Sequence, residues 1–343
     1  MKSAIQLHVV LLLTFEFAAG ASALEIALSN DDGWDAPGVQ AMKTALDGAG
    51  HNVTLAGPLD EQSGSSAAGN FVSDLVITKQ SPNEYSVATA GGTEGAEPAT
   101  SALIAIGIAK EANGGVAPDL LVMGINTSAN IGAAAQFSGT VGGTIAAIAN
   151  YLNGSLPAVA ISTDAPCDTD DPPGADLAAC EAVNDQHFAD VASFVADFIA
   201  HLETKPMFLA NEPGLLPPGI ALNINYPPLA AGDIQGVSLN VQGKLWVRGG
   251  TPLAIDFACF ACAAIPVGAS SPGGIRGAGF DPTPDVPGSD AAAFNAGFIT
   301  IVPIAADYTA DKSILEGFEK VIRGFNDEDS DSGTGAQRVT GNW

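Results

Sequence analysis

The sequence predicts a doubly wound α/β fold with a mostly parallel sheet. Short, β-rich apolar runs alternate along the chain with longer stretches in which apolar residues recur at helical spacing. Two of the short runs, Leu120–Gly124 and Ala158–Ile161, are apolar throughout, as expected of strands that helices cover on both faces. Polar clusters follow several runs, where an open α/β sheet binds its ligands. A Rossmann-like sandwich of three layers accounts for all of these observations.

Six short runs carry the strand pattern of the sheet. Helical stretches separate them, and this alternation of strand and helix is typical of parallel pairing. The predicted strands, in chain order, are Glu25–Ser29, Asn52–Ala56, Pro118–Gly124, Pro157–Ser162, Ala221–Asn225 and Phe298–Pro303.

The predicted helices each carry an apolar face. In the first, Val39, Met42 and Leu46 recur at helical spacing, Asp35 is the expected N-cap, and Pro37 lies in the first turn. Further helices are predicted at Val141–Leu152, over the apolar face from Phe188 to Leu202, and at Ile314–Ile322 near the C-terminus.

The N-terminus has the pattern of a secretory signal peptide. Lys2 precedes an apolar run that reaches Leu13, and Ala21-Ser22-Ala23 offers a cleavage site after Ala23. A membrane anchor needs about 20 apolar residues, and this run is shorter. Residues 1–23 are therefore expected to be removed, and the protein to be exported to the periplasm or the cell exterior.

One α/β domain is expected over residues 24–325. Two segments interrupt its rhythm: an Asp- and Pro-rich stretch at 164–185, which predicts an exposed insertion, and a Gly- and Pro-rich excursion at 237–287 with a β-hairpin around Gln242-Gly243. The acidic tail, residues 326–343, is predicted to be disordered.

The charge balance excludes several partners. The chain has 12 Lys and Arg against 38 Asp and Glu, a formal net charge of −26. Such a surface repels nucleic-acid phosphates and anionic lipid head groups, so neither a nucleic-acid polymer nor a membrane surface is an expected partner. An anionic substrate would need local positive charge, and a bound metal ion is the simplest source.

Four cysteines lie in two neighbourhoods, Cys167 with Cys180 and Cys259 with Cys262. In an exported protein the even number favours disulfides. Local pairing is the preferred interpretation, with the other connectivities left open. The Cys259-x-x-Cys262 spacing is also compatible with a redox pair or half of a zinc site, although no second such pair or nearby histidine supports zinc.

Polar clusters at three strand ends are the candidate site. Ser29–Gly33 follows the first strand, Gln62–Ser66 follows the second, and Gly124–Asn126, with Asn130 beyond it, ends the third. Asp31 and Asp32 are adjacent carboxylates that repel each other unless a proton or a cation intervenes. Oxygen ligands of this kind favour Mg²⁺ or Mn²⁺. The alternative is an N-cap followed by a turn aspartate.

Ser138-Gly139-Thr140 precedes a helical stretch. A helix N-terminus offers unpaired N–H groups and the positive end of a dipole, which suits phosphate. An ordinary helix cap is the alternative. His51, His187 and His201 have better explanations as structural residues, and no G-x-S-x-G elbow is present, so a Ser–His–Asp hydrolase is not expected.

The run Ile26–Gly38 closely resembles the opening of the SurE family of 5′/3′-nucleotidases. Similar segments follow in the family's order at Ala56–Ser66, Pro118–Gly132 and Ser138–Gly142, with weaker similarity in Leu222–Pro227 and Ser289–Ile301. Four ordered motifs at strand ends are more specific than any one of them alone.

The resemblance implies a metal-dependent, acid-phosphatase-like phosphomonoesterase that acts on nucleoside 5′- or 3′-monophosphates. It also implies a homodimer or homotetramer. One divalent cation, Mg²⁺ or Mn²⁺ with Ca²⁺ as a substitute, would activate a water molecule, with Asp31 and Asp32 as catalytic residues. The implied metal ligands are Asp31, Asp32, Ser63 and Asn126, and the implied phosphate contacts are Asn130, Ser138, Gly139 and Thr140.

The sequence departs from the family pattern in two places. Thr100 stands where the family has an acid, and the excursion lacks the family's Asp-Pro-Arg-Gly stretch. The first departure bears on nucleoside preference more than on hydrolysis, and the second on assembly and access to the site. The alternative function, from another class, is a secreted binding protein that captures a phosphorylated ligand or a metal ion on the same fold without turnover. A structural protein with an acidic tail is a third possibility.

Overall fold

The computed structural model describes residues 23–71, 73–149, 155–170, 172–204, 215–248, 251–257, 275–280 and 283–307, with 309, 312, 314–316 and 318. The chain separates into two compact units, Met1–Ala305 and Ala306–Trp343. The expected signal peptide up to Ser22, Cys259 and Cys262, and the acidic tail lie outside the described residues.

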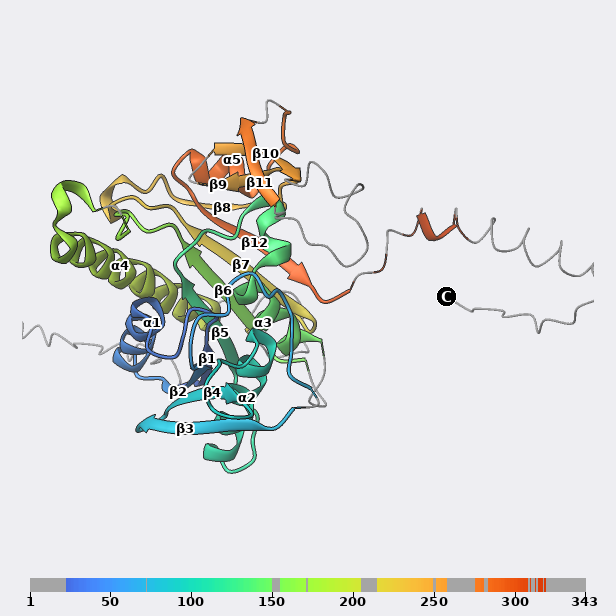
Figure 1. The fold of residues 1–343 in the computed structure, drawn as a ribbon. Helices are drawn as coiled ribbons and strands as arrows, with labels where there is room; N and C mark the ends of the chain where they lie inside the picture. The colour runs from blue at the N-terminus through green and yellow to red at the C-terminus, as the bar shows by residue number, and fades with distance from the viewer. Residues whose placement is uncertain are drawn as a thin grey trace, which may run out of the picture. The chain divides into compact units, whose positions relative to one another are not determined.

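The larger unit is built on a nine-stranded, mostly parallel sheet (Figure 1). Only β3 against β4 and β12 against β7 pair in the antiparallel sense within it. The predicted α/β sheet is confirmed. Across the sheet, the strands are β3 (Leu75–Ser81), β4 (Glu84–Thr89), β2 (Asn52–Pro58), β1 (Glu25–Ser29), β5 (Leu120–Asn126), β6 (Ala158–Thr163), β7 (Ile220–Tyr226), β12 (Ile299–Ala305) and β8 (Val237–Leu239).

The direction of winding reverses between β1 and β5. From β1 the chain moves to β2 on one side, and it later builds β5, β6 and β7 in succession on the other. A crevice forms at the carboxyl ends of the strands where the order reverses, because the loops on either side lead away from each other. The residues after Ser29 and after Asn126 border this crevice.

Two helices cover each face of the sheet (Figure 1). Helices α1 (Pro37–Gly48) and α4 (Leu177–Thr204) pack together on one face, and α2 (Pro98–Ala112) and α3 (Gly139–Ile148) pack together on the other. The predicted stripe of Val39, Met42 and Leu46 is fully buried in α1. Burial of such stripes against the apolar strands supplies the main stabilising force of the layers.

Two predicted helix starts were wrong. Asp35 does not cap α1, because Ala36 holds the N-cap position and makes no side-chain hydrogen bond there. Pro37 at the first helical position lacks the N–H that a cap would satisfy. Helix α3 begins at Gly139 rather than Val141, because the Ser138 hydroxyl accepts the Val141 N–H at 3.1 Å and caps the helix earlier.

The predicted hairpin turn at Gln242-Gly243 was also wrong. The Gly243 and Lys244 N–H groups donate to the carboxylates of Asp290 and Asp285, each at 2.8 Å, so they cannot close a hairpin. The residues of β8 lie at the start of the predicted excursion, but this strand joins the main sheet beside β12. The excursion itself is a separate antiparallel sheet of β9 (Trp246–Arg248), β10 (Thr251–Phe257) and β11 (Ile275–Phe280).

The predicted disulfide between Cys167 and Cys180 is present, with Cα atoms 5.4 Å apart. The Asn184 side chain also accepts the Cys167 N–H at 3.0 Å and donates to the Cys167 carbonyl at 2.9 Å. The expected insertion at 164–185 is largely exposed, but its second half is helical because α4 already starts at Leu177. The cross-link therefore fastens the loop after β6 to the first turn of α4.

The remaining helices are short or partly described. Helix α5 (Asp290–Asn295) precedes β12. Of the C-terminal helix predicted at Ile314–Ile322, residues 314–316 and 318 are helical and Ile322 lies outside the described residues. Within the described part of the chain, no helix combines the length and apolarity needed to cross a bilayer.

Replacing both Cys167 and Cys180 by Ala should lower the free energy of unfolding by about 3 kcal/mol, since a 13-residue separation closes a short loop in the unfolded chain. Urea unfolding of the oxidised protein and of the double variant measures this difference. Equal stabilities of the two proteins, with the thiols of the first shown to be oxidised, would contradict the expectation.

Candidate active site

Asp31 joins three loops at the crevice. Its side chain is 2 % exposed, and its Oδ1 accepts a 2.5 Å hydrogen bond from the Thr140 hydroxyl at the start of α3. Its backbone carbonyl accepts the Gln62 N–H at 2.7 Å. The end of β1, the loop after β2 and the start of α3 therefore converge on one carboxylate, as the sequence predicts.

Asp32 reaches across the crevice to the end of β5. Its Oδ2 accepts hydrogen bonds from the backbone N–H and the hydroxyl of Thr127, at 3.1 and 3.2 Å. Unlike Asp31, it is only partly buried. Sequence reasoning missed Thr127, although its position directly after Asn126 was the available signal.

The pair of carboxylates carries an electrostatic cost. Burial raises the pKa of Asp31, against the opposing effect of the Thr140 hydrogen bond. Burial, and then the negative charge of Asp31, raise the pKa of Asp32 to about 7. In the described part of the chain, the ion pairs with Lys or Arg are both made by Lys43. No such cation pairs with the two aspartates there, so a proton or a bound cation must offset their charge.

The other two implied metal ligands lie next to residues that contact this pair, since Asn126 precedes Thr127 and Ser63 follows Gln62. Asn126 ends β5 and is buried, and its side-chain N–H₂ group donates to the Ser128 carbonyl at 2.5 Å. This bond turns the amide oxygen away from Ser128. Ser63 is exposed and follows Gln62, whose N–H is bonded to Asp31.

The chemistry of this set fits a hard divalent cation, because all of its donors are oxygen atoms. The side-chain oxygen of Asn30, the residue before Asp31, has no hydrogen-bond partner among the described atoms and lies against Gly57 of β2. The described residues include no cluster of three or more His, Cys, Asp or Glu side chains suited to a metal ion. The predicted ligand set does not require such a cluster, because it combines two carboxylates with one amide and one hydroxyl.

The start of α3 lies directly against Asp31. A Cβ atom at Gly139 would fall 2.6 Å from Asp31 Oδ2 and 2.7 Å from Pro98 Cγ, so only glycine allows this approach. The Ser138 hydroxyl caps the helix and the Thr140 hydroxyl serves Asp31. Of the first-turn N–H groups, that of Val141 donates to the Ser138 hydroxyl and that of Thr140 to the Asp31 carboxylate. Among the described contacts, this leaves the Gly139 N–H as the donor for an anion at this end.

Asn130 is the centre of a buried amide network. Its side chain donates to the Ser162 hydroxyl at 2.8 Å, and its N–H donates to Asn225 Oδ1 at 2.6 Å. Asn223 returns a 2.9 Å bond to the Asn130 carbonyl. Strands β6 and β7 thus hold the loop that follows β5, and the Asn130 side chain is engaged by protein.

Two further aspartates, which sequence reasoning did not assign, anchor the neighbouring loops. Asp164 accepts the Ala129 N–H at 2.9 Å. Asp290 is fully buried and accepts N–H groups from Gly132, at 3.1 Å, and from Gly243. Burial raises the pKa of Asp290, and these N–H donors oppose that effect. Both residues therefore fix the backbone of the loop after β5, although neither belongs to the predicted site.

The histidines lie away from the carboxylate pair, as expected. His51 accepts the Leu24 N–H at the amino end of β1, at 3.2 Å. His187 is buried in α4 with Nε2 2.7 Å from the Thr163 hydroxyl, and burial lowers its pKa. Both histidines have structural partners, because the Thr163 hydroxyl beside His187 also donates to the Tyr226 carbonyl at 2.8 Å.

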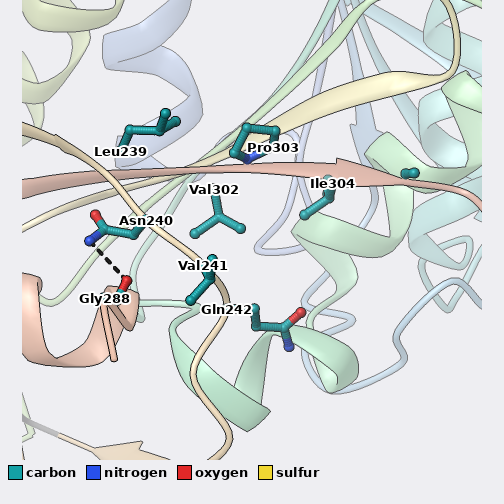
Figure 2. Close-up of a pocket in the computed structure, with 9 residues that line it drawn as sticks. Leu239, Asn240, Val241, Gln242, Gly288, Val302, Pro303 and Ile304 are labelled. Atoms are coloured by element: carbon teal, nitrogen blue, oxygen red, sulfur yellow. Dashed lines mark hydrogen bonds between the residues drawn. The ribbon is translucent and has the colours of Figure 1, made fainter. Parts of the chain in front are cut away.

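A cavity of about 640 Å³ lies elsewhere, between β8 with its following loop and β12 (Figure 2). It is lined by residues 239–242, 288 and 302–305, and none of these has a titratable side chain. The predicted site residues are all absent from its walls. The carboxylate crevice, rather than this apolar hollow, is the candidate active site.

Comparison with known proteins agrees with the sequence motifs. The profile of the family described as "Survival protein SurE" matches residues 26–248. The "5'-nucleotidase SurE" of Cereibacter sphaeroides (strain KD131 / KCTC 12085) is 30% identical over 301 residues, which cover 85% of this chain and 98% of that protein. The protein of the same name from Stenotrophomonas maltophilia (strain R551-3) is 31% identical over 222 residues, 64% of this chain and 70% of that protein.

The fold also has a solved counterpart. The crystal structure of the SurE protein from Aquifex aeolicus superimposes with a TM-score of 0.62 at 21% sequence identity, over 86% of this chain and 98% of that one. That similarity confirms the three-layer α/β architecture. Taken with the profile match and the curated relatives, it shows that this chain belongs to the SurE family.

Proposed function

We propose that the protein hydrolyses phosphate monoesters, with nucleoside 5′- or 3′-monophosphates as its main substrates. The observation that carries the proposal is the contact between Asp31 and Thr140, which places a carboxylate pair beside the N-terminus of α3. A phosphoryl group in the crevice would meet the two features that its transfer requires, namely oxygen ligands for a cation and N–H donors for its own oxygens. Membership of a family whose relatives are named 5′-nucleotidases supports the same reaction.

Asp31, Asp32, Ser63 and Asn126 would hold one divalent cation, Mg²⁺ or Mn²⁺. The cation would supply charge stabilisation for the phosphoryl oxygens and a lower pKa for water. The fit rests on the uncompensated charge of the two aspartates and on the all-oxygen donor set. An overall charge of −26 makes such local compensation necessary for an anionic substrate.

The two aspartates have different surroundings, and we assign them different tasks. Asp31 is buried and bonded to Thr140, so it is suited to holding the start of α3 in place. Asp32 is partly exposed, so water can approach it. Asp32 is therefore the better placed to orient the attacking water and accept its proton. The Gly139 N–H at the start of α3 would bind an outer phosphoryl oxygen.

Export and assembly stay predictions. The leader up to Ala23 indicates secretion, and a disulfide at Cys167–Cys180 is typical of an oxidising compartment. Assembly into a homodimer or homotetramer, which the family implies, is part of the same proposal.

Asp32→Asn should lower kcat for AMP by at least about 100-fold, the usual contribution of a positioned general base. Phosphate release in the presence of Mn²⁺ measures it. Asp119→Asn is the matched control, because Asp119 also accepts a backbone N–H, from Glu25 at 2.8 Å, but at the amino ends of β1 and β5. An Asp32→Asn variant as active as the Asp119→Asn control would contradict the assignment.

The metal-free protein should lose stability as the pH rises from about 4 to about 7. The pKa of Asp32 in the folded state lies above its ordinary value, so the folded state binds more protons in this range than the unfolded chain does. Thermal unfolding of the wild type and of Asp32→Asn measures the effect, and the variant should show a shallower decline. Added Mn²⁺ should raise the Tm of the wild type more at pH 8 than at pH 5, because the cation replaces the proton. Parallel pH profiles for the two metal-free proteins would refute this.

The protein recovered after export should begin at Leu24. N-terminal sequencing or intact mass of the material from the periplasm or medium checks the cleavage site. Recovery of the protein only inside the cell, with its leader intact, is the opposite result.

A further inference from the structure

Two aromatic rings meet beside the start of α3. The ring centroids of Phe137 and Trp246 are 5.4 Å apart, with a tilt of 52° between the rings. Phe137 is the last residue of the 3-10 turn η1 (Gly132–Phe137) and directly precedes Ser138, whereas Trp246 opens β9. We refer to Phe137 and Trp246 as the aromatic pair.

The aromatic pair is not part of the apolar core. Phe137 is 55 % exposed, although a phenylalanine gains most from full burial. Its neighbours Ser138, Gly139 and Thr140 are all buried. The chain therefore presents a large apolar ring to solvent next to the proposed phosphate-binding turn.

Backbone contacts hold the aromatic pair in position from two sides. The carbonyls of Gln136 and Phe137 accept the hydroxyl and the N–H of Ser66, at 2.9 and 3.3 Å. On the other side, the Leu245 carbonyl, one residue before Trp246, accepts the Ala133 N–H at 2.9 Å. A surface fixed in this way loses little conformational entropy when a ligand binds.

The location of the aromatic pair identifies what it would contact. Phe137 is two residues from Gly139, and consecutive Cα atoms are about 3.8 Å apart. A phosphate at the first turn of α3 would thus place the ribose, and then the base, of a nucleotide within reach of the ring. Every nucleobase has a π-face that can stack on an aromatic side chain. Such stacking does not depend on the hydrogen-bonding groups that distinguish one base from another.

We propose that Phe137 and Trp246 form the surface on which the nucleobase of the substrate stacks. This inference rests on the proposed phosphatase activity. It adds a binding surface for the nucleobase, the part of the substrate farthest from the phosphate ester. The pair selects esters with a planar aromatic group on the leaving side over esters of plain sugars, and it tolerates both purines and pyrimidines.

AMP and ribose 5-phosphate form the matched test, because they share the phosphate and the sugar and differ in the base. Phe137→Ala should lower kcat/KM for AMP by between about 5- and 150-fold, the range produced by the loss of one base–aromatic stack. The loss should fall on KM, since the base interacts equally with the enzyme before and during hydrolysis. Activity toward ribose 5-phosphate should change less than about twofold, and Phe137→Tyr should retain the AMP preference.

Two results would overturn the proposal. One is an equal loss for both substrates in Phe137→Ala, because that would show a structural effect on the neighbouring phosphate turn. The other is a wild-type enzyme that hydrolyses both esters with the same kcat/KM.

Binding keeps the inference testable if neither ester is hydrolysed. Calorimetric titration with AMP and with ribose 5-phosphate, in the presence of Mn²⁺, compares their affinities for the wild type and for Phe137→Ala. Tighter binding of AMP that disappears in the variant would support the aromatic pair while refuting the phosphatase activity. Equal affinities would refute the aromatic pair.

Discussion

Two adjacent carboxylates, which form no ion pair with a Lys or Arg among the described residues, are the constraint on which the rest of the site depends. Asp31 and Asp32 follow β1 at the point where the winding of the sheet reverses. Burial raises the pKa of both residues, and the negative charge of Asp31 raises that of Asp32 further, a cost that a merely structural turn would have no reason to keep. Hydrogen bonds from Thr140 and Thr127 fix the positions of the two carboxylates.

The surroundings are built to keep this arrangement fixed. Gly139 lets α3 begin against Asp31, where any side chain would collide. Farther out, Asn130 is held by side chains from β6 and β7, and Asp290 fastens the turn at Gly132 to the excursion. Each of these contacts joins segments that are far apart in the sequence. Strands β6 and β7 therefore position the loops of the site as well as forming part of the core.

Much of this could be predicted from the sequence, because continuous apolar runs locate the central strands and polar residues at their ends locate the crevice. Four features could not. The β3–β4 hairpin is an edge element whose exposed strand lacks an apolar pattern. The turn at Gly243 looked like a hairpin because its N–H partner, Asp290, is distant in sequence. Thr127 and the aromatic pair likewise acquire meaning only when separate loops come together.

A crystal of the exported protein soaked with Mn²⁺ and AMP would test the central claim most directly. Anomalous scattering at the manganese edge should locate one ion in contact with oxygen atoms of both Asp31 and Asp32. The phosphate should lie between that ion and the Gly139 N–H at the start of α3. An ordered phosphate at α3 with no manganese at the aspartates, or manganese bound at a separate surface site, would contradict the account.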